Sequence, residues 1–135
     1  MLEAQATEQN PSRVIITASV AGIGIGTTGR NGTFAYSASK AAAISLTKTL
    51  AVELGRRHIL TNAVAPGFFP SKMANGLMDL YGGPEGLGKQ SPNGRIGRPE
   101  DIAALVVFLS SRASSHLNGV VIRTDGGRLL AGAKL

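Results

Sequence analysis

The stretch RVIITAS at residues 13–19 decides the fold. Its apolar run is nearly continuous and rich in β-branched residues, which predicts a strand buried on both faces of a parallel sheet. Further strands are expected at residues 59–65 and 120–124. An alanine-rich helix is predicted over residues 33–57, and a second helix, opened by a proline and two acidic residues, over 99–111. Strands that alternate with helices in this way predict an α/β fold with three parallel strands.

The remaining segments read as connections and ends. Residues 1–9 read as the end of a helix, which Asn10-Pro11 closes because proline disfavours helix at the residue before it. Residues 21–32 form a long glycine loop, and residues 68–93 a second loop with one short helix at 72–80. Glycine and proline are frequent in the second half of that loop, which predicts mobility. Residues 129–135 are expected to be a free, flexible end.

The composition limits the classes of function. A length of 135 residues allows one domain, spanning residues 1–135. The chain has no cysteine and only two histidines, far apart in the sequence, so we expect no disulfide scaffold and no metal site. Its net charge is +6, but the basic residues are scattered and not interleaved with aromatics, so we expect no nucleic-acid partner. A phosphate-bearing cofactor accounts for the positive balance equally well.

The sequence also bears on location. Its longest weakly polar run, residues 14–26, is too short and too rich in glycine to span a bilayer, so no membrane partner is expected. The first ten residues do not have the basic-then-apolar pattern of a secretory signal. We therefore expect a cytoplasmic protein. The final tripeptide Ala133-Lys134-Leu135 resembles the peroxisomal Ser-Lys-Leu address, which makes the peroxisome the alternative.

Chemistry-bearing side chains converge at the carboxyl ends of the predicted strands, where parallel sheets place their ligand sites. Tyr36 and Lys40, four residues apart near the start of the first helix, share one helical face. A free phenol has a reference pKa of about 10, but a neighbouring ammonium group favours the phenolate. The phenol can then exchange a proton with a carbonyl or alcohol oxygen, which the hydroxyl of Ser19 can hold in place. Such a site cannot supply a hydride, so it implies a redox cofactor.

Five stretches in the same order resemble one family. These are VIITAS at 14–19, YSASK at 36–40, NAVAPG at 62–67, GRIGRPED at 94–101 and GVVIRTDGG at 119–127. Together they resemble the short-chain dehydrogenases/reductases, and in particular the members similar to 3-oxoacyl reductases. The match spans nearly the whole chain. It implies the C-terminal half of a Rossmann-like, doubly wound parallel sheet.

The resemblance implies a catalytic role for three residues. Tyr36 would be the general acid and base, and Lys40 would favour its phenolate form. Ser19 would orient the substrate oxygen. Ser19 precedes Tyr36 by 17 residues, a longer gap than is usual in the family, so Thr17 is kept as the alternative to Ser19.

The resemblance also implies a cofactor, NADP or NAD, with NADP preferred, and a small-molecule carbonyl or alcohol substrate. Tyr36 and Lys40 would lie at the nicotinamide ribose, and Lys40 would bond to it. Pro66 and Gly67 would border the nicotinamide, and Ser71 would take the place of a threonine that contacts the cofactor. A full-length member is expected to be a homo-oligomer.

A glycine pattern in the first loop imitates a dinucleotide fingerprint. Gly24, Gly26 and Gly29 match G-x-G-x-x-G, but the mechanism requires these glycines tightly between a strand and a helix, with an acidic residue ending the next strand. The strand at residues 59–65 has no acidic residue, so a flexible insertion beside the site is the preferred interpretation.

The phosphate-binding loop of the family lies upstream of the catalytic serine, so the first βαβ half is expected to be absent from this chain. Two hypotheses follow. The chain is an oxidoreductase, or it is a truncated, catalytically silent fragment that associates with full-length relatives. In either case the first strand is expected to form an uncovered, apolar sheet edge.

Overall fold

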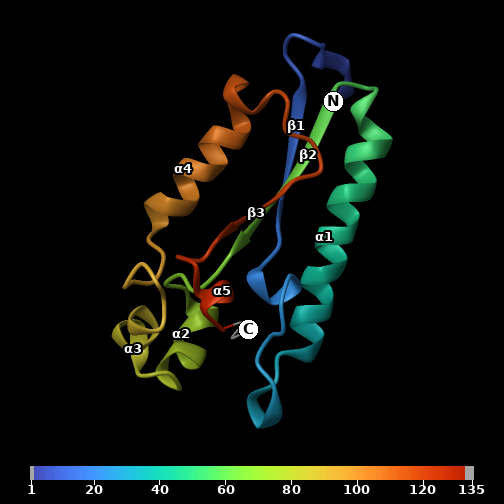
Figure 1. Ribbon diagram of the computed structural model, residues 1–135. Coiled ribbons are helices and arrows are strands. Elements are labelled where there is room, and N and C mark those ends of the chain that lie inside the picture. The colour runs from blue at the N-terminus through green and yellow to red at the C-terminus, as the bar shows by residue number, and fades with distance from the viewer. Residues whose placement is uncertain (1, 133–135) are drawn as a thin grey trace.

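The computed structural model describes residues 2–132 as a three-stranded parallel sheet with helices on both faces (Figure 1). Strands β1 (Ser12–Thr17), β2 (Ile59–Pro66) and β3 (Val121–Thr124) are hydrogen-bonded in the order β1-β2-β3, and both pairings are parallel. The predicted α/β fold with three parallel strands is confirmed. Among the described residues β1 is an edge strand, as the sequence predicted.

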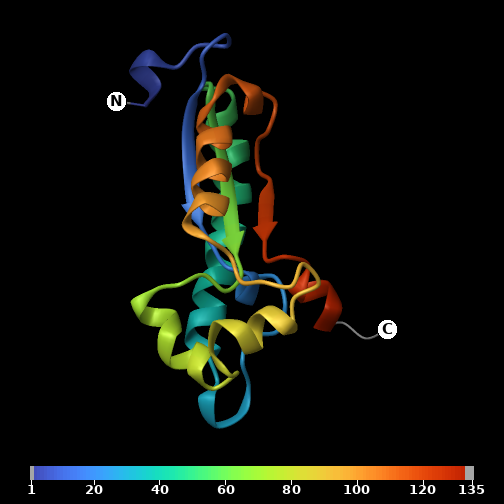
Figure 2. The same cartoon turned by 90° about the vertical axis from the view of Figure 1, so that its left-hand side faces the viewer.

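One long helix covers each face of the sheet. Helix α1 (Phe34–Gly55) packs on one face and α4 (Pro99–Ser110) on the other (Figure 2). The core between α1 and the sheet is made of small side chains, Ala18, Ala63 and Ala65, with Ala43 and Ile44 packed against them. Small residues let the helix backbone approach the strands closely, which fixes the position of the third turn of α1 on the sheet.

The central strand is held by the amide side chains of buried Asn62 and exposed Asn118. Asn62 donates to the Leu117 carbonyl oxygen (2.8 Å) and accepts from the Val120 amide (3.1 Å). Asn118 accepts from the Thr61 amide and donates to the Ala51 carbonyl oxygen, each at 2.9 Å. These four bonds continue the pairing of β2 beyond the start of β3, so the short third strand is aligned by side chains as well as by its ladder.

The segment after β2 contains more helix than the sequence predicted. Helix α2 (Lys72–Asp79) confirms the expected short helix, but α3 (Gly83–Lys89) lies where a mobile loop was expected. Gly82, with φ of 78°, turns the chain between the two helices, and Pro84 occupies the first turn of α3. The sequence analysis interpreted these residues as helix breakers, whereas in the structure they mark the start of α3.

Both ends of the chain also differ from the predictions. Within residues 2–9 the structure has the 3₁₀ turn Glu3–Gln5 and not the predicted helix end, because the backbones of Thr7 and Asn10 bond to each other, at 3.2 Å in both directions, instead of continuing a helix. The expected flexible end at 129–135 begins instead as helix α5 (Arg128–Gly132). The Asp125 carboxylate holds its start by accepting from the Gly127 and Leu129 amides at 3.0 and 2.9 Å. The tripeptide Ala133-Lys134-Leu135 lies outside the described residues.

A helix that crosses a bilayer must be long and predominantly apolar. Within residues 2–132, no helix has both the length and the apolar character needed to cross a membrane.

Candidate active site

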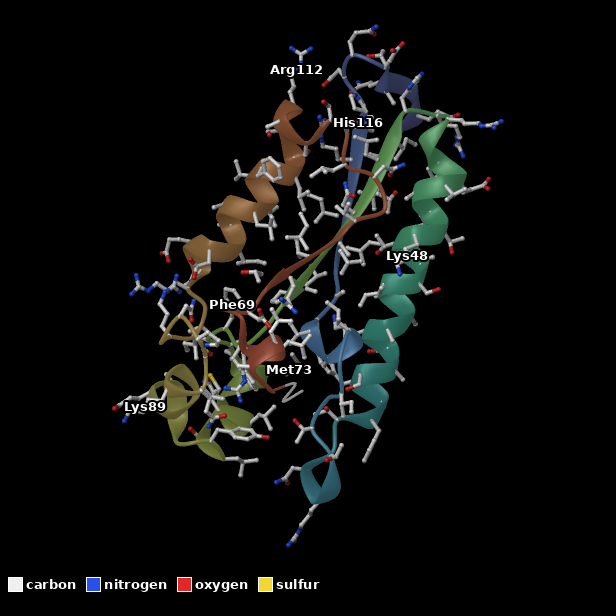
Figure 3. The ribbon with its side chains drawn as sticks, viewed as in Figure 1. Lys48, Phe69, Met73, Lys89, Arg112 and His116 are labelled. Atoms are coloured by element: carbon white, nitrogen blue, oxygen red, sulfur yellow. The ribbon has the colours of Figure 1, made fainter. Side chains whose placement is uncertain are left out.

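The sequence-predicted site residues gather at one end of the molecule, where the three strands end. This end is at the bottom of Figure 1 and holds the start of α1 together with α2, α3 and α5. In Figure 3, Met73 and Lys89 lie in this lower part, whereas Arg112 and His116 lie at the opposite end. The parallel topology therefore places residues from four separate segments at one edge of the sheet, as the sequence predicted.

Tyr36 and Lys40 occupy the first two turns of α1. The Lys40 ammonium lies 5.6 Å from the centre of the Tyr36 ring, close enough for a cation–π contact. Lys40 Nζ also donates to the Thr17 carbonyl oxygen at 2.9 Å. One lysine thus touches the phenol ring and the last residue of β1, which orients the charged group at the sheet edge.

The sequence predicted Ser19 as the last residue of a strand. In the structure Ser19 instead caps the 3₁₀ turn Val20–Gly22. Strand β1 stops at Thr17, and Ser19 Oγ accepts from the Ala21 amide at 3.2 Å. This local bond competes with strand continuation, as serine side chains commonly do. Ser19 is only 7% exposed.

The turn after Ser19 packs directly on α1. A Cβ added at Gly22 would lie 2.6 Å from the Lys40 carbonyl carbon, so only glycine permits this approach. The contact joins the turn that carries Ser19 to the helical turn that carries Lys40. Thr17, the alternative to Ser19, contributes its backbone carbonyl to Lys40.

The residues expected beside the cofactor lie at the end of β2 and directly after it. Pro66 is the last residue of the strand and pairs with Thr124, and the Gly67 amide donates to the Thr124 carbonyl oxygen at 2.9 Å. A Cβ at Gly67 would lie 2.7 Å from Asp125 Cβ, so the close approach of the two chains just after β2 and β3 end requires glycine. Ser71 caps α2 by accepting from the Ala74 amide at 3.1 Å, which leaves its own hydroxyl proton free to donate.

The glycine loop that imitates a fingerprint is fastened to α1 rather than loose. The Thr27 amide donates to Thr33 Oγ1 at 3.1 Å, and the Thr33 amide donates to the Thr27 carbonyl oxygen at 2.9 Å. Gly24 lies against Leu129, and Gly26 against Ser37 and Thr33. The 3₁₀ turn after Ser19 separates the loop from β1, so the glycines do not form the strand-to-helix turn of a dinucleotide fingerprint.

The structure also contains a cavity that none of the predicted site residues lines. It has a volume of about 420 Å³ and lies between the start of α4 and the end of β3, with Phe69, Arg95, Asp101 and Thr124 among its lining residues. Arg95 donates two hydrogen bonds to the Asp101 carboxylate, at 2.6 and 3.0 Å. Together with the Arg98 amide, these bonds lower the pKa of Asp101 to about 2. The ion pair closes one side of this cavity.

Sequence reasoning missed Arg128. Its guanidinium donates to the Leu87 carbonyl oxygen at 3.2 Å and to Gln90 Oε1 at 2.8 Å. These partners lie 41 and 38 residues earlier in the chain, so no local pattern announces the contact. The only sequence signal is its position just after Asp125-Gly126-Gly127, which marks a turn at the end of β3.

The chain resembles known proteins in both sequence and fold. The family model described as enoyl-(acyl carrier protein) reductase matches residues 1–128. The chain belongs to the short-chain dehydrogenases/reductases. The 3-oxoacyl-(acyl-carrier-protein) reductase FabG of Rickettsia bellii is 43% identical over 106 residues, which are 78% of this chain and 43% of the relative. The 5-keto-D-gluconate 5-reductase of Escherichia coli K12 is 40% identical over 103 residues, 76% of this chain and 41% of the relative.

A solved structure extends the likeness to three dimensions. The structure described as a Pseudomonas aeruginosa RhlG/NADP active-site complex superposes with a TM-score of 0.82 at 41% identity, covering 94% of this chain and 50% of that one. This short-chain dehydrogenase/reductase chain therefore spans less than half the length of the two curated relatives and half of the solved one. The predicted resemblance to 3-oxoacyl reductases is confirmed.

Proposed function

We propose that this chain carries the proton-transfer part of an NADP- or NAD-dependent oxidoreductase that acts on a carbonyl or a secondary alcohol. The observation that carries the proposal is the placement of Lys40, which lies 5.6 Å from the Tyr36 ring and is bonded to the Thr17 carbonyl oxygen. A phenol and an ammonium group held together at the carboxyl ends of parallel strands are suited to general acid–base chemistry on a C–O group.

Tyr36 is the proposed proton carrier. In the reducing direction its hydroxyl donates a proton to the carbonyl oxygen as that oxygen becomes an alcohol, and the Lys40 charge stabilises the phenolate that remains. In the oxidising direction the phenolate accepts the alcohol proton. The hydrogen bond to Thr17 restricts the Lys40 ammonium to the side of α1 where the phenol lies, so the charge is in place before substrate binds.

Ser19 is proposed to hold the reacting oxygen. Its Oγ accepts from the Ala21 amide, which fixes the side chain and leaves the hydroxyl proton to be donated to substrate. Because the backbone on both sides of Ser19 is tied down, by the Ala18 amide to the Val64 carbonyl oxygen and by the Gly22 contact with α1, the hydroxyl needs little reorganisation on binding.

The donors at this end fit the polar part of a nicotinamide nucleotide. Lys40 Nζ uses one of its three donors on Thr17, Ser71 has a free hydroxyl proton, and Gly67 presents backbone without a side chain. A bound nicotinamide supplies or accepts the hydride, so the residues of this chain need to move only a proton. NADP is preferred because the similar P. aeruginosa protein is described as an NADP complex.

The test compares the two tyrosines of the chain. We expect the purified protein to bind NADPH and to oxidise it in the presence of a 3-oxoacyl thioester or 5-ketogluconate. The loss of absorbance at the nicotinamide band measures this oxidation. Tyr36→Phe should lower kcat/KM by about 10²- to 10⁴-fold, the usual contribution of a general acid. Tyr81→Phe, which likewise removes one phenol oxygen but keeps the ring that lies beside Arg128, is the matched control and should leave kcat within about twofold.

Two results would overturn the proposal. Equal loss in both variants would show that Tyr36 has no special role. Absence of NADPH binding and of turnover in the folded, wild-type chain would instead favour the alternative of a silent fragment that associates with full-length relatives.

A further inference from the structure

The guanidinium of Arg128 lies at the junction of three segments that are far apart in the sequence. Its central carbon lies 5.0 Å from the centre of the Phe68 ring and 6.0 Å from that of Tyr81. The two rings are 6.3 Å apart and tilted by 58°. Arg128 also donates to the Leu87 carbonyl oxygen and to Gln90 Oε1. One side chain from the start of α5 therefore contacts the loop after β2, the α2–α3 connection and the end of α3.

The position of Arg128 is set by the turn that follows β3. Asp125, whose side chain is 3% exposed, accepts from the Gly127 and Leu129 amides and forms an ion pair with Arg123 at 3.3 Å. Gly126 and Gly127 have φ values of 63° and 85°, which residues other than glycine rarely adopt. The turn is thus determined by a buried carboxylate and two glycines, and it aims Arg128 toward α3.

The opposite side of the contact is equally well defined. Leu87 is fully buried, and its carbonyl oxygen accepts from Ser91 Oγ at 3.2 Å as well as from Arg128. Phe68 directly follows Pro66-Gly67, and its carbonyl oxygen accepts from the Gly97 amide at 2.9 Å. Arg128 therefore acts on a residue next to the proposed nicotinamide site and on the helix pair that lies beyond it.

We propose that Arg128 is a positioning residue, which fixes Phe68 and the α2–α3 segment over the end of β2 and thereby shapes the substrate side of the site. Its effect on catalysis rests on the proposed function, whereas its effect on the position of residues 68–90 does not. Arg128 touches none of the proposed reacting groups. It should therefore act on substrate binding, measured by KM, more than on the chemical step, measured by kcat.

The contact requires arginine rather than any cation. A planar guanidinium can stack on aromatic rings while its N–H groups donate in the plane to two acceptors, which a lysine ammonium cannot do at once. Burial lowers the pKa of Arg128 from its ordinary value, while Tyr81 acts in the opposite direction. The group is thus partly withdrawn from water, where stacking and hydrogen bonds to a charge are stronger.

The experiment measures amide hydrogen exchange and kinetics on the same proteins. Arg128→Met keeps the apolar stem, Arg128→Lys keeps the charge, and Gln90→Leu removes one acceptor from the exposed side of the contact. Arg56→Met, an exposed arginine at the far end of α1, is the control. Arg128→Met should raise the exchange rate of α2 and α3 amides, and KM, each by about tenfold, with kcat within about twofold. Gln90→Leu should give a smaller change in the same direction, and Arg128→Lys should restore little.

The exchange measurement needs no substrate, so it separates this inference from the proposed function. An inactive chain in which Arg128→Met loosens α2 and α3 selectively supports the positioning role and contradicts only the enzymatic proposal. Exchange that is unchanged in α2 and α3, or raised equally in α1 and α4, would overturn the inference. A fall in kcat with an unchanged KM would also overturn it, because that pattern belongs to a group acting in the chemical step.

Discussion

Lys40 Nζ donates a hydrogen bond to the carbonyl oxygen of Thr17 over 2.9 Å, so one side chain fastens the start of α1 to the end of β1. The same ammonium lies 5.6 Å from the Tyr36 ring. The bond satisfies a carbonyl on β1, the edge strand of the described sheet, and aims the charge at the phenol. A structural anchor and a proposed catalytic charge are therefore the same atom.

Replacement of Lys40 should show how much each of these two roles contributes, because one is measured by kcat and the other by stability. Lys40→Met removes both, so we expect kcat to fall by about 10²-fold or more, while stability falls by no more than about 1 kcal/mol because the bond is exposed to solvent. Lys48→Met, two turns along the same helix and also exposed, is the control and should change neither. Urea denaturation and steady-state kinetics measure the two effects. A large loss of stability with unchanged kcat would assign Lys40 to the fold alone.

Two glycines test the packing of the turn that carries Ser19. Gly22→Ala places a Cβ 2.6 Å from backbone atoms of α1, which cannot give way locally, so we expect a loss of about 1–3 kcal/mol. Gly76→Ala, in α2, meets nothing within 4 Å and should be neutral or stabilising by up to about 1 kcal/mol. Thermal melts of both variants give the comparison. Equal effects would mean that the turn does not dock on α1.

The contact of α4 with the sheet should depend on one buried leucine. Leu109 is 1% exposed, so Leu109→Ala should cost about 2–5 kcal/mol through lost burial and the cavity left behind. Val107, on the same helix, is 67% exposed, and Val107→Ala should cost less than about 0.5 kcal/mol. Chemical denaturation distinguishes the two. Similar costs would show that α4 packs through a different face.

Asp101 should contribute to the pH dependence of stability. Its pKa is lowered to about 2 by the bonds from Arg95 and the Arg98 amide, whereas in the unfolded chain a carboxyl of this kind titrates near 4. A lowered folded-state pKa means that the contribution is complete above pH ~4 and is lost as the pH falls toward ~2. The difference in melting temperature between the wild type and Asp101→Asn should therefore shrink over this interval.

The control for this prediction is Glu100→Gln, which removes the neighbouring carboxylate on the exposed side of α4. The difference in melting temperature between the wild type and Glu100→Gln should change little between pH 4 and 2. A difference in melting temperature between the wild type and Asp101→Asn that stays constant over the same pH range would contradict the ion pair with Arg95.

Much of the fold was predictable because it depends on local pattern. The apolar runs at residues 13–19 and 59–65 predicted the bounds of β1 and β2 to within two residues, and the alanine-rich pattern predicted the bounds of α1 with similar accuracy. Helix α3 was missed because Gly82, Gly83 and Pro84 are breakers in most contexts. Whether such residues break a helix or begin one depends on what the following residues pack against, and Leu87 becomes fully buried only in the folded chain.

The sequence by itself determined the family, the parallel sheet and the edge at which the proposed site lies, because residue type and spacing set strand period, helix face and strand ends. Only the tertiary structure decided how the side chains at that edge are held. It placed Lys40 on the Thr17 carbonyl, turned Ser19 from a strand end into a capping residue, and brought Arg128 to Phe68 and α3. Such contacts join residues that are tens of positions apart, and they form only when the strands are in register and the helices packed.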